Sequence, residues 1–453
     1  MKTALSVAFF LAILFLLPLS QDNPSLESLD AESVRLGLAF FACIACLWMS
    51  EALPLAITAL LVPVLGTALG LTNLQDSLKS FAHPLIFLFL GGFALASALS
   101  AQGLDRWLAG KLSALGKGKF LPVSLLLFLG TALLSMWMSN TATAAMMIPL
   151  ALGILGNFQD NKNEQNSRFL LLGLAYSASI GGLGTIVGSP PNGIAAKQLD
   201  ITFAQWMAFG IPTVAILLPT MAAVLYFLLK PTNTSASAGN QGEMVAQFQF
   251  TKSRIVTLSI FALTALSWMF SKPLGDALSV KDMDTWIAIS AIILLAVTKV
   301  VTWKQIESST EWGVLLLFGG GLALSSILQT SGTSLFMARI LGETVIHWPL
   351  LGIIAGVVAF VIFLTELSSN TATAALLVPI FYTMATEFQL APAQLILPLA
   401  LASSCAFMLP VGTPPNAIVF ATGRIPQKSM IRSGIVLNLL FVALIAALSL
   451  VLF

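Results

Sequence analysis

Two stretches of the chain, SNTATAAMMIP at residues 139–149 and SNTATAALLVP at residues 369–379, are near copies that begin 230 positions apart. A second pair follows in the same order, GSPPN at residues 188–192 and GTPPN at residues 412–416. Chance similarity explains this poorly, because Asn, Ser and Pro are costly within the apolar runs that surround both pairs. Two markers in one order at nearly one spacing therefore predict an internal duplication.

The composition predicts a membrane protein. Of the 453 residues, 57% are hydrophobic and 9% are charged, whereas a soluble domain carries roughly 25% charged residues. The apolar residues fall into runs of about 17–25, the length of a bilayer-spanning helix. The net charge of +2 gives no indication of a nucleic-acid partner. Two His and three Cys are a poor supply for a metal enzyme or a disulfide framework, so we expect no enzyme.

We expect an all-α polytopic membrane protein with about 11 transmembrane helices. These spans are expected near residues 4–19, 36–51, 53–70, 85–102, 169–205, 207–229, 255–271, 285–298, 312–330, 392–422 and 433–452. The first of them also fits a secretory signal peptide, but no A-x-A cleavage pattern closes it. A retained first helix is therefore favoured.

The positively charged residues orient these spans. With the N-terminus in the cytoplasm, 15 of the 21 Lys and Arg residues fall in cytoplasmic loops, as the positive-inside rule requires. This bias survives only if two further apolar stretches, residues 121–152 and 349–381, each enter and leave on one side of the membrane. We therefore expect two re-entrant hairpins and two repeats that are inverted relative to each other.

The duplication divides the chain into four parts. We expect a first helix and outer loop at residues 1–35, a first inverted repeat at 36–230, a polar cytoplasmic linker at 231–254, and a second inverted repeat at 255–453. Each repeat contains one re-entrant hairpin and one interrupted helix. The scaffold and transport domains would draw on both repeats.

The repeated motifs fall where the backbone is expected to leave the helical path. An arm of about 15 residues reaches only about 22 Å, so each SNT tip should lie deep in the membrane. In each G-[ST]-P-P-N motif, the paired prolines bar helix continuation. A helix interrupted there exposes carbonyls at one end and N–H groups at the other. Carbonyls and hydroxyls suit a hard cation such as sodium, and helix N-termini favour an anion.

No Arg or Lys lies close to these motifs; Lys197 follows the first break by five residues. An anion bound there needs neutral donors, helix dipoles and bound cations, because a buried charge is expensive without a counter-charge. This favours cation-coupled anion transport, although neutral solutes stay open on this argument. For Glu366 we expect a hydrogen bond to the hairpin tip, in preference to cation binding or a role in tuning the coupling. For Asn192 and Asn416, bracing of the break and a place in the ligand shell are equally favoured.

At these motifs the chain resembles the divalent anion–sodium symporter family, which carries dicarboxylates and citrate. The resemblance covers nearly the whole chain, and also includes SEALPLAITALLVPV near residue 50. It implies a homodimer whose transport domain moves as an elevator in the bacterial inner membrane. The implied function is sodium-coupled symport of C4-dicarboxylates such as succinate, malate or fumarate. A sodium-independent dicarboxylate exchanger and a citrate or sulfate symporter remain the alternatives.

The resemblance also implies roles for individual residues. The first sodium site would comprise Ser135, Ser139, Asn140 and Gly188, and the second Thr365, Ser369, Asn370 and Gly412. The dicarboxylate site would be lined by Asn140, Thr141, Ser189, Asn370, Thr371, Thr413 and Pro414. Two functions from other classes were also considered. A membrane-embedded hydrolase would need a nucleophile with a base, but no His or Lys lies near either SNT motif. A channel is less favoured, because opposed hairpins and interrupted helices suit an occluded site at mid-membrane better than an open pore.

Overall fold

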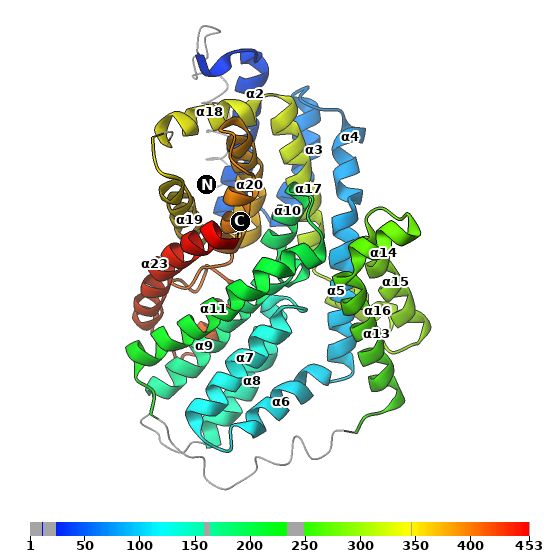
Figure 1. Ribbon diagram of the computed structural model, residues 1–453, viewed down its shortest axis with the longest axis vertical. Coiled ribbons are helices and arrows are strands. Elements are labelled where there is room, and N and C mark those ends of the chain that lie inside the picture. Colours follow the sequence, from blue (N-terminus) through cyan, green and yellow to red (C-terminus); the bar gives the residue numbers. More distant parts are fainter. Residues whose placement is uncertain (1–10, 12–23, 158–163, 233–248, 346, 453) are drawn as a thin grey trace.

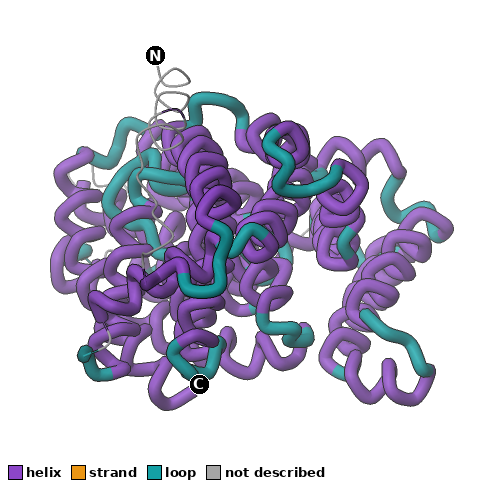
Figure 2. The backbone as a smooth tube through the Cα atoms, turned by 90° about the horizontal axis from the view of Figure 1, so that it is seen from above, coloured by secondary structure: helices purple, strands orange, loops and turns teal. Residues whose placement is uncertain are grey.

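The computed structural model describes residues 11, 24–157, 164–232, 249–345 and 347–452, and within them every regular element is a helix (Figures 1 and 2). The N-terminal half contains η1 (Pro24–Leu26), α2 (Ala31–Ser50), α3 (Leu55–Ala68), α4 (Leu74–Lys79), η2 (Ser80–Ala82), α5 (Pro84–Ala101), α6 (Leu104–Leu115), α7 (Phe120–Ser135), α8 (Asn140–Asn157), α9 (Glu164–Gly181), η3 (Gly182–Gly184), η4 (Ile186–Gly188), α10 (Pro190–Gln198) and α11 (Phe203–Leu229).

The second repeat contains α13 (Lys252–Met269), α14 (Ser271–Leu278), α15 (Met283–Val297), α16 (Trp303–Ser309), α17 (Trp312–Thr330), α18 (Thr333–Val345), α19 (Leu350–Thr365), α20 (Asn370–Glu387), α21 (Ala393–Ser403), α22 (Pro414–Ala421) and α23 (Gln427–Leu452). The expected first helix at residues 4–19 and most of the expected linker at residues 231–254 lie outside the described residues.

The two repeats pair crosswise. Helix α3 packs against α17, and α5 packs against α15, which is the counterpart of α3. The broken helices exchange partners in the same way, since α10 contacts α20 and α22 contacts α8. Exchanged pairing of this kind is what inverted repeats produce. The predicted fold class, an all-α protein with two inverted repeats, is confirmed.

The two SNT motifs lie at the turns of two helical hairpins, as the sequence predicts. Helix α7 ends at Ser135 and α8 begins at Asn140, while α19 ends at Thr365 and α20 begins at Asn370. The first hairpin lies in the lower half of Figure 1 and the second in the upper half. Both return arms run past the expected ends at residues 152 and 381, because the prolines inside α8 and α20 do not end these helices.

Each G-[ST]-P-P-N motif lies at a break between two helices. In the first repeat, α9 ends at Gly181 and α10 begins at Pro190, with η3 and η4 between them. In the second, α21 ends at Ser403 and α22 begins at Pro414. Proline is well tolerated at a first helical position because its missing N–H has no partner there in any case. The prolines thus begin the second helix of each broken span.

Fewer helices cross a membrane unaided than the expected count of spans. Among the described residues, five helical segments are long and apolar enough by length and composition: Ala31–Ser50, Leu74–Ala101, Phe203–Leu229, Trp312–Thr330 and Gln427–Leu452. A sixth appears if the bent pair α13 and α14 counts as one span. Within the described residues, the other expected spans are shorter apolar helices, such as α3 and α15, or helices interrupted by a break. The chain is a multi-pass membrane protein.

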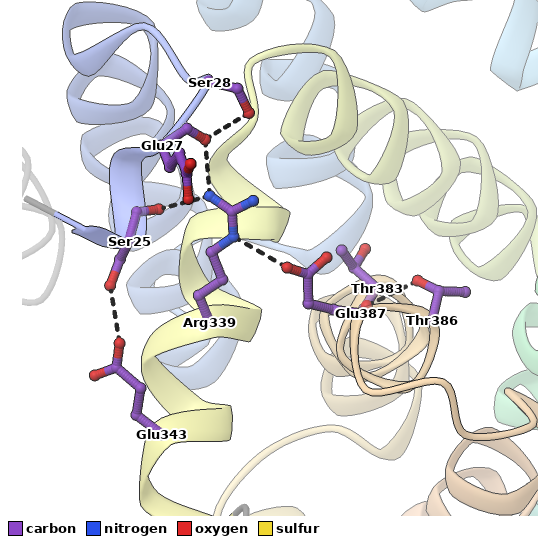
Figure 3. A network of polar contacts seen from close by, with 8 residues as sticks. All are labelled: Ser25, Glu27, Ser28, Arg339, Glu343, Thr383, Thr386 and Glu387. Carbon is purple, nitrogen blue, oxygen red and sulfur yellow. Dashed lines mark hydrogen bonds and ion pairs between the residues drawn. The ribbon is translucent and has the colours of Figure 1, made fainter.

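Helix α18 is fastened to the N-terminal segment and to the second hairpin (Figure 3). Arg339 on α18 pairs with Glu387 at the end of α20, with 3.1 Å between Nε and Oε1. The same guanidinium donates from Nη1 to the carbonyl oxygens of Ser25 and Glu27. The hydroxyl of Ser25 in turn donates to Glu343. This contact ties three segments that are distant in the sequence.

Candidate functional site

The hairpin tips and the helix breaks meet at one cavity of about 790 Å³. The expected site residues that line it are Ser139, Asn140, Thr141, Gly188, Ser189, Ser369, Asn370, Thr371, Gly412, Thr413 and Pro414. The two remaining expected residues, Ser135 and Thr365, are fully buried behind the cavity wall. No Lys or Arg is among the residues that line the cavity in the described part of the chain, whereas two acidic loop residues, Glu51 and Glu311, are.

Four helix N-termini converge on this cavity. Helices α8 and α20 begin at Asn140 and Asn370, and α10 and α22 begin at Pro190 and Pro414, all of which line it. Each N-terminus carries a partial positive charge. Helices α8 and α20 also present backbone N–H groups without helical partners, whereas the first two residues of α10 and of α22 are prolines, which have no N–H. The side chains of Ser189 and Ser369 occupy N-cap positions but do not cap α10 and α20. The cavity therefore offers an anion neutral donors and dipoles in place of basic side chains.

Oxygen atoms cluster behind the first hairpin tip. The Ser135 hydroxyl donates its one hydrogen to the Ala178 carbonyl at 2.7 Å, and Asn140 Oδ1 lies 2.6 Å from the same hydroxyl oxygen. The same Oδ1 position lies 3.0 Å from the Ala178 carbonyl oxygen and 3.3 Å from that of Gly188. Both carbonyls belong to segments at the first break, where α9 comes to its end. Helix C-terminal carbonyls carry partial negative charge and attract cations.

The Asn140 amide fits this position with its NH₂ group turned toward the oxygens, where it donates to Ser135 Oγ and to the carbonyl oxygens of Ala178 and Gly188. These bonds hold the hairpin tip to the break. Hydroxyl, amide and carbonyl oxygens are ligands that hard cations prefer. The donor set of the first expected sodium site therefore fits the ion.

Two glycines allow the close approach of the backbone at this site. A Cβ on Gly182 would lie 2.5 Å from Asn140 Oδ1, and a Cβ on Gly188 would lie 2.5 Å from the Gly182 carbonyl oxygen. Both distances are far inside van der Waals contact. Any larger residue would therefore push the break away from the hairpin tip.

The second repeat builds a matching cluster. The Thr365 hydroxyl lies 2.7 Å from Asn370 Oδ1 and 3.0 Å from the Ser403 carbonyl oxygen, and its one hydrogen can bond to either. Thr365 corresponds to Ser135, and Ser403 ends α21 much as Gly181 ends α9. The structure thus brings each expected set of cation ligands together. Their roles in binding stay predictions.

Asparagine side chains hold both breaks. Asn192 donates from Nδ2 to the carbonyl oxygens of Gly182 and Thr185, both at 2.8 Å. Asn416 donates to those of Ala406 at 2.9 Å and Leu409 at 3.1 Å. Of the two interpretations left open for these residues, the contacts favour bracing. Buried carbonyls without a partner would cost free energy, so these amides stabilise the unwound segments.

The expectation for Glu366 was wrong. Its carboxylate does not bond to its own hairpin tip but to the second break, where the backbone N–H groups of Phe407 and Met408 donate to Oε1 and that of Leu409 donates to Oε2. Asn438 on α23 donates to the same Oε1 at 2.7 Å. The sequence pattern placed Glu366 next to the tip, but the fold turns its side chain to the neighbouring helix break.

The sequence analysis missed three further residues at the breaks. Trp206 donates from Nε1 to the Leu183 carbonyl at 2.9 Å, and the Tyr176 hydroxyl donates to the Phe407 carbonyl at 2.7 Å. Asn438 is the third, and a buried Asn within an apolar helix is a signal that could have found it. Trp206 and Tyr176 carry no such signal, since both types occur widely in apolar runs.

Comparisons with known proteins agree with this architecture. The sequence pattern of the citrate transporter family (CitMHS) matches residues 45–397. An uncharacterized transporter of Haemophilus influenzae is 48% identical over 424 residues, covering 90% of each chain. The sodium-dependent dicarboxylate transporter SdcS of Staphylococcus saprophyticus is 34% identical over 467 residues, covering 96% of this chain and 88% of its own.

A solved structure has a similar fold. The YdaH transporter of Alcanivorax borkumensis, which is described as having an unusual topology, matches with a TM-score of 0.58 over 84% of this chain and 88% of its own. At 15% identity this likeness concerns the fold alone. The sequence matches confirm the resemblance to the divalent anion–sodium symporters. The chain belongs to the citrate transporter family and is a membrane transporter, not an enzyme.

Proposed function

We propose that this member of the citrate transporter family is a secondary transporter that couples the uptake of C4-dicarboxylates, such as succinate, malate and fumarate, to sodium. The observation that carries the proposal is the convergence of four helix N-termini on a cavity whose described lining has no Lys or Arg. Such a cavity favours an anion. The two oxygen clusters behind the hairpin tips would bind the cations that balance the charge of the anion.

In this proposal sodium binds first. Its proposed ligands are Ser135, Ser139, Asn140 and Gly188 in the first repeat, and Thr365, Ser369, Asn370 and Gly412 in the second. The dicarboxylate then binds among Asn140, Thr141, Ser189, Asn370, Thr371, Thr413 and Pro414. Coupling follows because a dianion without these cations would remain buried and uncompensated. Each net positive charge that moves with the substrate adds about 2.3 kcal/mol per 100 mV of membrane potential.

The helix contacts suggest which parts move. Helices α3, α5, α15 and α17 pack together, and the hairpins pack with the broken helices and with α11 and α23. We assign the first group to a scaffold that forms a homodimer, and the second to a transport domain that slides past it as an elevator. The division into two repeats, at residues 36–230 and 255–453, with the linker 231–254, underlies this assignment.

The distribution of positive charges supports a bacterial inner-membrane location with a cytoplasmic N-terminus. In that orientation the loops that carry Glu51 and Glu311 face the cytoplasm. Because both residues line the cavity and Glu51 is exposed, the state described here would be open to the cytoplasm. An outward-open state would then expose the same tips to the other side.

Uptake by the purified full-length protein in proteoliposomes tests the proposal. Labelled succinate should accumulate when sodium is high outside and the vesicles contain no substrate. Accumulation should stop when choline replaces sodium. Uptake that appears only with dicarboxylate preloaded inside would instead identify an exchanger, and the sodium assignments would be wrong. Citrate, which the family description names, serves as the competing substrate, and stronger accumulation of citrate would overturn the dicarboxylate assignment.

A further inference from the structure

The carboxylate of Glu366 is the only acidic group among the described residues that bonds to either helix break. It is 3% exposed and accepts hydrogen bonds from three consecutive backbone N–H groups, those of Phe407 at 2.7 Å, Met408 at 2.8 Å and Leu409 at 3.0 Å. Together with Asn438, four donors surround one carboxylate. All four neighbours donate, so they complement the carboxylate form and oppose the cost of burying its charge.

The corresponding position in the first repeat is Met136, 230 residues earlier. There the break also donates to the hairpin, but both partners are neutral, because the Thr185 hydroxyl in the break donates to the Met136 backbone carbonyl. The Met136 side chain packs against Gly184 without a polar contact. The first repeat therefore holds its break with neutral groups, and the second holds it with a charge.

The charge lies next to the second oxygen cluster. Glu366 directly follows Thr365, whose hydroxyl lies within hydrogen-bond distance of Asn370 and of the Ser403 carbonyl. A Cβ on Gly412 would lie 3.0 Å from Glu366 Oε2, so the carboxylate also adjoins the expected ligand at the break. In a site with little water, a negative charge a few ångströms away attracts a cation much more strongly than neutral oxygens do.

We propose that Glu366 is a positioning residue that makes the two cation sites unequal. It fixes the second break by accepting hydrogen bonds from the backbone N–H groups of that break, and it adds a negative charge that adjoins the second site, so that this site binds sodium more tightly and fills first. The inference rests on the proposed function, since it concerns the sodium sites of that function. It assigns the order of filling to one side chain.

A matched pair of variants tests it. Glu366→Gln removes the charge and keeps the size, and Met136→Gln places the same side chain at the related position of the first repeat. The readout is the rise of the thermal unfolding temperature of the full-length protein with sodium, choline keeping the ionic strength constant. We expect Glu366→Gln to raise the sodium concentration for half of this rise by about tenfold or more, as loss of a nearby charge predicts.

Met136→Gln should leave that concentration within about twofold of the unsubstituted protein, since no charge changes near the first site. Glu366→Asp keeps the charge and should stay within about threefold. A purely structural brace would lower the unfolding temperature equally in sodium and in choline and would leave the sodium concentration unchanged. That result, or equal shifts in the two Gln variants, would overturn the inference.

Two further outcomes are decisive. If Glu366→Gln does not purify as a folded protein, Glu366→Asp decides, because a tenfold loss of sodium affinity with the charge retained would show that geometry alone matters. If the unsubstituted protein shows neither a sodium-dependent rise nor sodium-dependent uptake, the proposed function fails and the inference fails with it. A sodium response that is present but equally altered in both Gln variants contradicts the inference alone.

Discussion

The two helix breaks do the same structural work with different chemistry. At the first break, Trp206 and Asn192 hold carbonyl oxygens, and the Thr185 hydroxyl holds the neighbouring hairpin. At the second, Glu366 holds three N–H groups, and Tyr176 reaches across from the other repeat to hold the Phe407 carbonyl. Different side chains can therefore provide hydrogen-bond partners for the unwound backbone and keep the geometry of the two breaks alike. The charge next to the two breaks nevertheless differs.

The repeats also differ in how the hairpins meet the connecting helices. Helix α6 packs against α7, the first arm of its hairpin, whereas α18 packs against α20, the second arm of its own. A transporter built from inverted repeats changes state when one repeat takes up the arrangement of the other. In the proposed elevator motion, the contacts of α6 with its hairpin and those of α18 with its hairpin would therefore change places.

The largest expected effect tests whether both repeats contribute to one site. Asn140→Ala and Asn370→Ala should each lower succinate uptake by about a hundredfold or more, above the loss of 10–100-fold typical of outer-shell residues at ion sites. Each amide borders an oxygen cluster and the cavity. The control is Thr143→Val, which removes a buried hydroxyl without a partner and should leave uptake within about twofold. Normal uptake by either Asn variant would restrict the site to one repeat.

A second pair of variants sharpens the comparison of the breaks. Gly188→Ala should destabilise the protein by about 1–3 kcal/mol, because its Cβ would meet the backbone oxygen of Gly182 at 2.5 Å. Gly412→Ala should cost less, about 1 kcal/mol, since its nearest neighbours, Glu366 Oε2 at 3.0 Å and Ala406 Cβ at 3.1 Å, lie further away and need to shift only slightly. Thermal unfolding in detergent ranks the two variants. The reverse order would mean that the second break is the tighter one.

The smallest effect concerns the contact in Figure 3. The side chains of Arg339 and Glu387 are 22% and 35% exposed, so breaking their ion pair should cost only about 0.2–1 kcal/mol. The related position of the first repeat is Gly110, which offers no such pair. A double-mutant cycle with Arg339→Gln and Glu387→Gln measures the coupling. Coupling well above this range would mark the pair as a lock between α18 and the second hairpin.

The sequence predicted most of the fold because its signals were repeated. Paired SNT motifs located both hairpin turns, and paired prolines located both breaks. The expected hairpin ends at residues 152 and 381 came too early, because α8 and α20 continue past Pro149 and Pro379. A proline inside a membrane helix is tolerated where neighbouring helices supply the missing contacts. The span count also exceeded the number of helices that are long enough alone. Interrupted and bent helices are as apolar as a membrane span, but each of their segments is too short to cross the membrane alone. Hydropathy therefore counts them as spans.

The candidate site was predictable only where a residue type was unusual for its surroundings. Asn140 and Asn370 stood out as polar groups in apolar runs. The partners of the breaks did not, because Tyr176 and Trp206 act through contacts between helices that sequence spacing does not reveal. Glu366 stood out but its partner was misjudged, since adjacency in the chain says little about which neighbouring segment a side chain faces.

Isothermal titration of the purified full-length protein with succinate tests the central claim most directly, namely that two repeats build one dicarboxylate site that requires sodium. In sodium we predict one succinate per chain, and in choline at the same ionic strength no measurable binding. Two succinates per chain would mean that each repeat forms its own site. Binding that is unchanged in choline would contradict the role of the oxygen clusters as sodium sites.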